Sequence, residues 1–307
     1  MSAKMIPVLP ITDTRLTSST LPEDDFDAWA VGTTYAATAD DAPVKVIKGH
    51  VIYASLQGSN VGNDPEVVAN QGVWWTKGLA TNRWSVFDGY IQNQSSRAES
   101  ATWVVTPGAI TNSVSLFNLI GESVTIVVTD PTDGEVYNRT FPLVDNTAVV
   151  DAYTYFFSPI VTIDNLCVTD LPPYGAAAIS VTVSNAGSTA AVGQIAFGYS
   201  EVLGITLNEV PLGINDFTRL NEDSFGRTTP VIRGYSRTAT PAIAVDSFRV
   251  TYLEKKLADQ RGIPTVWAFD TRHGDNQLVY LGFFSSYNFM YQYAEKTILD
   301  IDIRSLV

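Results

Sequence analysis

Residues that usually carry redox, metal-binding and acid–base chemistry are scarce in this chain. Its 307 residues include one cysteine, Cys167, and two histidines, His50 and His273. A single cysteine excludes an intrachain disulfide, and Cys167 lies in an apolar segment where a thiol is usually buried as a small hydrophobic group. Cysteine and histidine ligands of a transition metal occur in groups at short spacings, which this sequence lacks. We therefore predict no metal site and no cofactor.

Basic residues and long apolar runs are scarce as well. The chain has 19 Lys and Arg against 32 Asp and Glu, a net charge of −13, whereas binding to a nucleic-acid backbone relies on clustered Lys and Arg. No apolar stretch approaches the roughly 20 residues that a membrane-spanning helix needs. The apolar patch near the N-terminus is broken by Pro7 and Pro10, unlike the continuous core of a secretory signal. We expect no nucleic-acid partner, no membrane insertion, and folding in a cytoplasm.

The composition that is present favours a folded core. Hydrophobic residues make up 45% of the chain, aromatic residues 11% and charged residues 17%. The charged fraction is below the usual value of about 25%, and such a composition argues against disorder. At roughly 100–200 residues per domain, this length predicts two or three folded units.

Short strands separated by turns fill the middle of the chain. Residues 123–129 and 135–141 are rich in β-branched side chains and flank a Pro/Asp/Gly turn, which is typical of a hairpin. A second hairpin is predicted from residues 178–183 and 190–199, with a turn between them. Many short strands without intervening helices predict a mainly β fold, with an antiparallel, jelly-roll-like β-sandwich over residues 83–244.

Three other segments complete the predicted organisation. Residues 1–25 contain three prolines and a Thr/Ser cluster and predict an extended N-terminal arm. Residues 26–82 hold three of the six tryptophans and predict a small aromatic-cored β module with a strand turn at Lys48. Residues 245–307 predict an α+β segment with one helix, because Asp246 is a candidate N-cap and apolar residues follow at helical spacing. Strands are predicted after the helix at residues 265–269, 277–284 and 296–303.

The small module carries the most informative candidate binding residues. They are aromatic residues on predicted strands and amides in the loop between them: Tyr53, Gln57, Asn60, Asn63, Trp74 and Trp75. Sugar rings stack on aromatic planes while their hydroxyls bond to amides, so this set is a candidate carbohydrate-binding site. The alternative is that a module of this size needs large aromatic side chains to fill its core. Neighbouring strand residues point to opposite faces, so we expect only one of the two tryptophans to be buried.

No catalytic constellation is visible in the sequence. It contains no phosphate-binding P-loop, dinucleotide fingerprint, serine nucleophile elbow or His-Glu-x-x-His helix. A pair of carboxylates can hydrolyse a glycosidic bond, but with 32 acidic residues spacing alone identifies no pair. Residues 130–134 lack the ligand pattern of a calcium loop and indicate a turn, and His273 falls in a predicted solvated loop. We predict no catalytic residue and no enzymatic activity.

A succession of motifs in the first module is recognisable. It consists of a tryptophan-led segment, a tyrosine-centred strand, an Asn/Gly/Pro loop and a closing tryptophan pair, at residues 29–35, 51–56, 60–65 and 73–75. This order resembles the small carbohydrate-binding modules of chitinases and phage tail proteins. Residues 79–89 resemble the junction in a family of tailed-bacteriophage and prophage tail structural proteins. Later segments resemble the same family, so that the resemblance covers most of the chain: residues 129–131, 136–137, 153–157, 169–174 and 264–267.

The resemblance implies a structural component of a bacteriophage tail, in the tail tip, baseplate or fibre-attachment region. Such a virion protein is synthesised in the host cytoplasm, and its partners are other tail proteins and further copies of itself around or beside the tail axis. Two alternatives stay open: a host-surface glycan-binding tail protein, and a tail enzyme that degrades polysaccharide. Residues 1–22 favour assembly, because an extended arm gains order on a neighbouring subunit. Residues 37–43 are an insertion relative to the family and favour structural use of the module.

Overall fold

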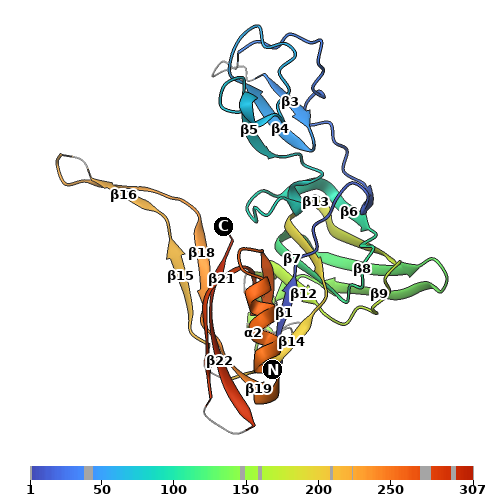
Figure 1. The fold of residues 1–307 in the computed structure, drawn as a ribbon, viewed down its shortest axis with the longest axis vertical. Helices are drawn as coiled ribbons and strands as arrows, with labels where there is room; N and C mark the ends of the chain where they lie inside the picture. The colour runs from blue at the N-terminus through green and yellow to red at the C-terminus, as the bar shows by residue number, and fades with distance from the viewer. Residues whose placement is uncertain are drawn as a thin grey trace.

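The computed structural model describes a mainly β protein. The described residues are 2–37, 44–145, 149–157, 161–207, 210–222, 224–269, 278–291 and 295–306. His273 and most of the insertion at 37–43 lie outside them. Strands make up 53% of the chain and helical residues 9%, which confirms the predicted fold class. Figure 1 shows a small module at one end of the molecule, joined to two larger β bodies that lie side by side.

A seven-stranded antiparallel sheet forms one of the larger bodies. Its order is β12-β7-β13-β6-β2, and β8 pairs with both β13 and β9. The bounds are β2 Leu16–Ser19, β6 Ser95–Val105, β7 Ser113–Ile120, β8 Ser123–Asp130, β9 Gly134–Pro142, β12 Asn165–Val168 and β13 Ala178–Gly198. Burial alternates along β8, because one face packs on the core and the other faces solvent. The β8–β9 pair confirms the first predicted hairpin.

The second predicted hairpin is wrong, because β13 is one continuous strand. The segment expected to turn forms a bulge between Ser184 and Thr189, and β6 pairs with β13 on both sides of it. A partner distant in sequence therefore holds the two halves in line. Residues 190–198 are all buried, because part of this half also packs on the other large body. Gly198 permits that contact, since a Cβ there would lie 2.4 Å from the carbonyl oxygen of Pro7.

The other large body is a closed six-stranded barrel. Its strands follow the order β22-β19-β14-β1-β20-β21, and β21 pairs with β22 to close the ring. The bounds are β1 Ser2–Pro7, β14 Glu201–Thr206, β19 Ala242–Asp246, β20 Thr265–Ala268, β21 Val279–Met290 and β22 Lys296–Ser305. β20, β21 and β22 confirm the strands predicted after the helix. β14 and most of β19 precede residue 245, yet they share a sheet with β20, β21 and β22. The predicted boundary between residues 83–244 and 245–307 therefore runs through the barrel sheet.

Helix α2 (Val250–Asp259) packs on the barrel core. Leu253 and Leu257 are fully buried in the cluster that the inward-facing strand residues form, which confirms the predicted helix and its spacing. Its predicted N-cap is wrong. Asp246 makes no capping bond, and its carboxylate pairs with Lys296 instead, because β19 continues through residue 246. Short 3-10 turns lie elsewhere in the chain and before α2: η1 Val68–Asn70, η2 Ser85–Phe87 and η3 Ser247–Arg249.

The N-terminal residues pair with strands of the two bodies, so they do not form the separate extended arm that the sequence predicts. β1 lies between β14 and β20, and β2 pairs with β6. Met5 faces the barrel core and Ile6 faces the seven-stranded sheet, and both are fully buried. A strand covered on both faces shows no alternation of apolar and polar residues. Because this alternation is missing, the sequence of residues 1–22 gives no sign of a strand. Pro7 does not prevent the strand, because it is the last residue of β1.

The small module is a three-stranded antiparallel sheet. Its strands are β3 Lys45–Lys48, β4 Val51–Ser55 and β5 Trp75–Ala80, in the order β3-β4-β5. The turn between β3 and β4 confirms the one predicted at Lys48. Its central residues, Gly49 and His50, have φ angles of 54° and 64°, and consecutive positive φ angles match the twist of hairpin strands.

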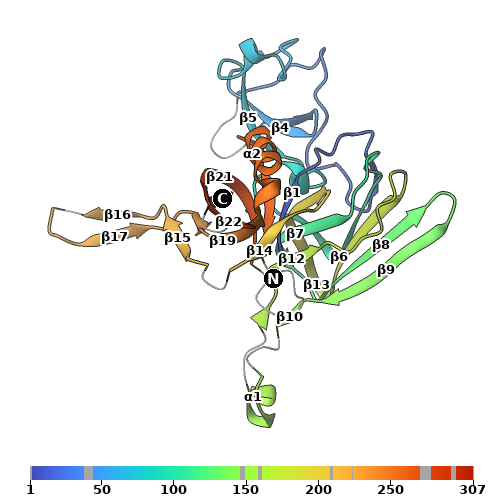
Figure 2. The same ribbon diagram turned by 60° about the horizontal axis from the view of Figure 1, so that its bottom comes forward.

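Two extensions project from the larger bodies in different directions (Figure 2). We call residues 212–239 the hairpin arm; it comprises β15 Leu212–Asp216, β16 Arg219–Glu222, β17 Thr228–Val231 and β18 Tyr235–Ala239. We call residues 144–162 the helical arm; it comprises β10 Val144–Asp145, α1 Ala152–Phe157 and β11 Val161–Thr162. β18 joins the hairpin arm to β22 of the barrel.

Candidate functional site

The predicted aromatic site forms the core of the small module. Trp75 is fully buried at the start of β5, and its indole N–H donates to the backbone oxygen of Asn63 over 2.7 Å. Tyr53 on β4 is 3% exposed. Tyr35 packs edge-on against Trp75 with ring centroids 5.2 Å apart. These rings fill the space between the sheet and the loops, so they present no free plane for a ligand.

The predicted amides hold the loop between β4 and β5 in place. The Asn60 side chain is buried and donates to Ser55 Oγ at 3.1 Å and to the backbone oxygen of Trp74 at 3.3 Å. Asn63 Nδ2 donates to Asn60 Oδ1 at 2.9 Å. The exposed Gln57 donates to the backbone oxygen of Val73 at 2.9 Å. All three side-chain amides donate hydrogen bonds within the loop, and these bonds stabilise its conformation.

Trp74 is the one predicted aromatic residue that stays half-buried. It packs against the module core, whereas its neighbour Trp75 is fully buried; the expectation that only one of the pair is buried is confirmed. The structure therefore brings all six predicted residues into one module. Of these, Gln57 is exposed, Trp74 and Asn63 are half-buried, and Tyr53, Asn60 and Trp75 are buried.

Two aromatic partners of this core were absent from the predicted set. Tyr35 accepts the backbone N–H of Ala30 at 2.8 Å and so ties the entry of the module to its core. Trp29 lies under the ammonium group of Lys48, which is 4.1 Å from the ring centroid. Both residues occur in the tryptophan-led segment at the start of the module. The tryptophan-led motif at residues 29–35 could have identified both residues as members of the aromatic core.

Charged groups beside the module core shift the acidity of its residues. Burial, followed by the negative charges of Glu66 and Asp64, raises the pKa of the Tyr53 phenol. The pKa of Asp64 is lowered, mainly by its hydrogen bond from Lys48 Nζ at 2.5 Å. These shifts keep the phenol neutral and the carboxylate charged around neutral pH, which suits a structural role in the module.

His50 connects the small module to the rest of the molecule. Its Nε2 lies 2.6 Å from Asp13 and its Nδ1 lies 2.8 Å from Glu23. The imidazole also stacks on Trp84, with centroids 4.2 Å apart. Thr81 Oγ1 donates to the same Glu23 carboxylate at 2.9 Å. Both ring nitrogens contact carboxylates, so His50 links the β3–β4 turn of the module to the segment that contains Asp13 and Glu23.

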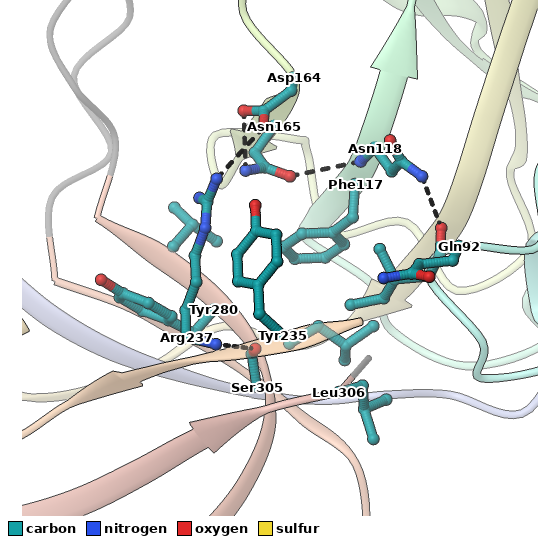
Figure 3. Close-up of a pocket in the computed structure, with 13 residues that line it drawn as sticks. Gln92, Phe117, Asn118, Asp164, Asn165, Tyr235, Arg237, Tyr280, Ser305 and Leu306 are labelled. Atoms are coloured by element: carbon teal, nitrogen blue, oxygen red, sulfur yellow. Dashed lines mark hydrogen bonds and ion pairs between the residues drawn. The ribbon is translucent and has the colours of Figure 1, made fainter. Parts of the chain in front are cut away.

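A pocket of about 340 Å³, lined by both polar and apolar residues, lies between the barrel and the seven-stranded sheet (Figure 3). Arg237 on β18 reaches Asp164 with Nη2 at 3.4 Å, and its backbone N–H donates to Ser305 Oγ at 2.8 Å. On the opposite wall, Asn118 Nδ2 donates to the backbone oxygen of Ile91 at 2.9 Å. Of these three bonds, the one between Arg237 and Asp164 joins the two bodies, and each of the other two lies within one body.

Electrostatics in this pocket favour a fixed cation at Arg237 and a neutral phenol at Tyr280. Burial alone lowers the pKa of Arg237, but the hydrogen bond with Tyr235 and the charge of Asp164 outweigh it, and the net shift is upward. Burial raises the pKa of Tyr280. Arg237 is therefore a permanent positive charge that Asp164 balances.

The described part of the chain offers few groups suited to metal binding or nucleophilic chemistry. No cluster of three or more His, Cys, Asp or Glu side chains suited to a metal ion occurs there. Cys167 is buried between the two large bodies, and burial raises the pKa of its thiol to about 11. Of the helices that the structure describes, none is long and apolar enough to cross a membrane.

Comparison of the chain with protein-family models, with curated proteins and with solved structures found no match. The arrangement of its own residues is therefore the basis for a functional proposal.

Proposed function

We propose that this chain is a structural subunit of a bacteriophage tail, in the tail tip, baseplate or fibre-attachment region, that assembles with other virion proteins. The observation that carries the proposal is the exposure of large apolar side chains on the hairpin and helical arms. The exposed side chains indicate assembly with other proteins, and the sequence resemblance to tail structural proteins indicates that the assembly is a phage tail.

The hairpin arm is apolar yet exposed. Every residue of β15, β16 and β17 is exposed. Its large apolar residues are at least 39% exposed: Leu212, Ile214, Phe217, Leu220, Phe225, Val231, Ile232 and Tyr235. A two-stranded hairpin is marginally stable by itself in water, and exposed apolar patches mark interaction surfaces. Contact with another subunit would stabilise this arm.

The helical arm also exposes large apolar side chains that would normally be buried. α1 has six residues and no buried member, although four of them are large aromatic residues that are 69–73% exposed: Tyr153, Tyr155, Phe156 and Phe157. Asp151 accepts the backbone N–H of Thr154 at 2.7 Å and caps the helix. An isolated helix this short is unstable in water, so a partner surface is expected to complete it.

The small module also supports assembly over sugar recognition. Trp75 and Tyr53 fill its core, and Asn60 and Asn63 hold its loop. A glycan site would need an aromatic plane and free amide groups side by side. These four residues of the sugar-binding pattern instead contribute to the packing and hydrogen bonds of the module itself.

Locating the chain on virus particles tests the proposal. An epitope tag on the exposed N-terminal end of β1 would be followed through particle purification and imaged by electron microscopy. We expect the tag at the tail. Recovery of the chain only in the soluble lysate, with tailed particles complete without it, would contradict the proposal. Specific binding of the purified chain to host glycans would favour the glycan-binding alternative.

A further inference from the structure

The pocket between the barrel and the seven-stranded sheet has a tyrosine ring in its wall that the protein holds in place. Tyr235 lines the pocket and is 47% exposed. The guanidinium group of Arg237 donates a hydrogen bond to the Tyr235 hydroxyl and also pairs with Asp164. Phe117 and Tyr280 line the same pocket but are only 3% and 7% exposed. Among the described lining residues, Tyr235 therefore provides the open aromatic plane.

Gln92 supplies a free amide in the wall of the same pocket. Figure 3 shows it across the pocket from Arg237. Its side chain is exposed, and within the described part of the chain it has neither a hydrogen bond nor an ion pair. A side-chain amide carries two N–H donors and an acceptor oxygen. Gln92 can therefore bond to the hydroxyl groups of a ligand that lies in the pocket.

The loop that carries Gln92 is fixed on the sheet. Asn118 Nδ2 donates to the backbone oxygen of Ile91, and Gln94 Nε2 donates to the backbone oxygen of Asn118, both at 2.9 Å. Asn118 has a φ angle of 53° within β7, and strained backbone of this kind is common at ligand sites. Gly193 lets the loop approach β13, because a Cβ there would lie 2.0 Å from the backbone oxygen of Ile91. A fixed loop reduces the entropy that binding would cost.

The charge and size of the pocket restrict the kind of ligand that fits. Arg237 and Asp164 are the charged residues of the described lining, and they are paired with each other, so the lining has no net charge. Val279, Leu281 and Leu306 add apolar surface. The volume of about 340 Å³ is near the lower end of the range for ligand sites, about 300–1,000 Å³. These properties suit a neutral, ring-sized ligand that has an apolar face and hydroxyl groups around its edge.

We propose that this pocket binds one neutral pyranose sugar unit, with the C–H face of the sugar on the Tyr235 ring and its hydroxyl groups bonded to the Gln92 amide. The inference goes beyond the proposed function and does not rest on it, because a structural subunit can also carry a sugar pocket. It places sugar binding outside the small module, whose Tyr53 and Trp75 rings are buried. The binding of one unit does not by itself make the chain a host-recognition protein.

Nuclear magnetic resonance of the full chain with free sugars tests the pocket. The probes are the methyl glycosides of glucose, galactose and N-acetylglucosamine. For at least one of them we expect saturation transfer to the C–H protons and a dissociation constant on the order of 1 mM, because so small a ligand has limited affinity. Tyr235→Ala should weaken binding roughly 10-fold or more, and Gln92→Ala should weaken it roughly 3-fold to 10-fold. Tyr235→Phe keeps the ring and should weaken binding less than Tyr235→Ala.

Tyr252 provides a matched control for the ring. It lies on α2, outside the pocket, and is 48% exposed, so Tyr252→Ala should leave sugar binding unchanged. Gln57→Ala and Trp74→Ala change the small module and should leave it unchanged as well. Thermal melts of Tyr235→Ala and Tyr252→Ala should match, because both side chains are about equally exposed.

Three results would overturn the proposal. The first is the absence of binding for all three sugars up to ten times the expected dissociation constant. The second is a loss of binding in Trp74→Ala or Gln57→Ala but not in Tyr235→Ala, which would place the site in the small module. The third is binding of adenosine, used as a flat aromatic probe, without binding of any sugar.

Location on the virus particle separates this proposal from the proposed function. A chain that binds a sugar through Tyr235 but is missing from tailed particles would support the sugar pocket and overturn the tail assignment. A chain found at the tail that binds none of the sugars would support the tail assignment and overturn the sugar pocket.

Discussion

Trp75 and Trp74 are adjacent in sequence and differ in what surrounds them. Trp75 is fully buried and bonded to Asn63, and Trp74 lies at the edge of the same core. We predict that Trp75→Ala lowers the free energy of unfolding of the small module by about 3–5 kcal/mol. Trp74→Ala should cost clearly less. Hydrogen exchange over residues 44–80 would measure both.

A ligand-binding role for Trp74 would give a different pattern. In that case Trp74→Ala would abolish binding on a glycan array and leave hydrogen exchange in the module unchanged. We expect no such loss, because the neighbouring amides of Asn60 and Asn63 already donate within the loop.

Cys167 makes stability depend on pH in the alkaline range. Burial raises the pKa of its thiol from 9.0 to about 11, so the unfolded chain loses this proton first as pH rises. The stabilisation is fully present below pH 9 and is lost as pH rises through 11, by up to about 2–3 kcal/mol. Denaturant titrations at several pH values would show the fall. The buried phenols of Tyr53 and Tyr280 have raised pKa values as well and add to it.

The Cys167→Ala variant isolates the contribution of the thiol. Its absolute stability at neutral pH will be lower, because a buried side chain is shortened, so the comparison concerns the slope with pH. We expect a shallower decline between pH 9 and 11 than in the natural chain. Parallel curves for the two proteins would contradict a thiol contribution.

At the scale of elements, β1 links β14 to β20 in the barrel. Met5 has no exposed surface and contributes to the barrel core. We predict that Met5→Asp destabilises the protein by about 3–5 kcal/mol, the cost of a buried charge without a partner. Chemical denaturation followed by near-ultraviolet circular dichroism would measure it.

Ser2 provides the control on the same strand. It is exposed, and it pairs through its backbone with Ile205, so Ser2→Asp should change stability by less than about 0.5 kcal/mol. Equal, small effects of the two substitutions would show that β1 is held only loosely.

The sequence predicted those elements that local signals specify. The β8–β9 hairpin follows from its turn residues, and α2 follows from the spacing of Leu253 and Leu257. It did not predict β1 or the continuity of β13, because both depend on partners distant in the chain. The sequence pattern correctly placed the six candidate residues in one module. It did not predict that Trp75 is buried or that Asn60 donates within the loop, because both depend on side-chain packing that a sequence pattern does not show.

At the scale of the whole molecule, His50 is the contact that positions the small module. It joins Asp13 and Glu23 and stacks on Trp84. We predict that His50→Ala leaves the melting temperature of the barrel unchanged and loosens the module relative to it. Small-angle scattering should show a broader distribution of particle dimensions, and hydrogen exchange should rise at residues 13–27.

Lys77→Ala is a suitable comparison, because Lys77 is an exposed residue on β5 of the same module. Its scattering profile should match that of the natural chain. A His50→Ala profile identical to that of the natural chain would mean that the remaining contacts, such as Asp25 to Asn82, orient the module by themselves.

The place of β1 in the barrel has a consequence for biosynthesis. Lys4 pairs with Ala268 on one side and with Val202 on the other, so β1 must wait for strands that are synthesised much later than itself. Pairing over such separations is slow, and unpaired apolar strands aggregate while they wait. The barrel cannot close before β20, β21 and β22 have been translated. A ribosome stalled ahead of residue 265 would therefore carry a nascent chain whose N-terminal strand still needs protection by a chaperone.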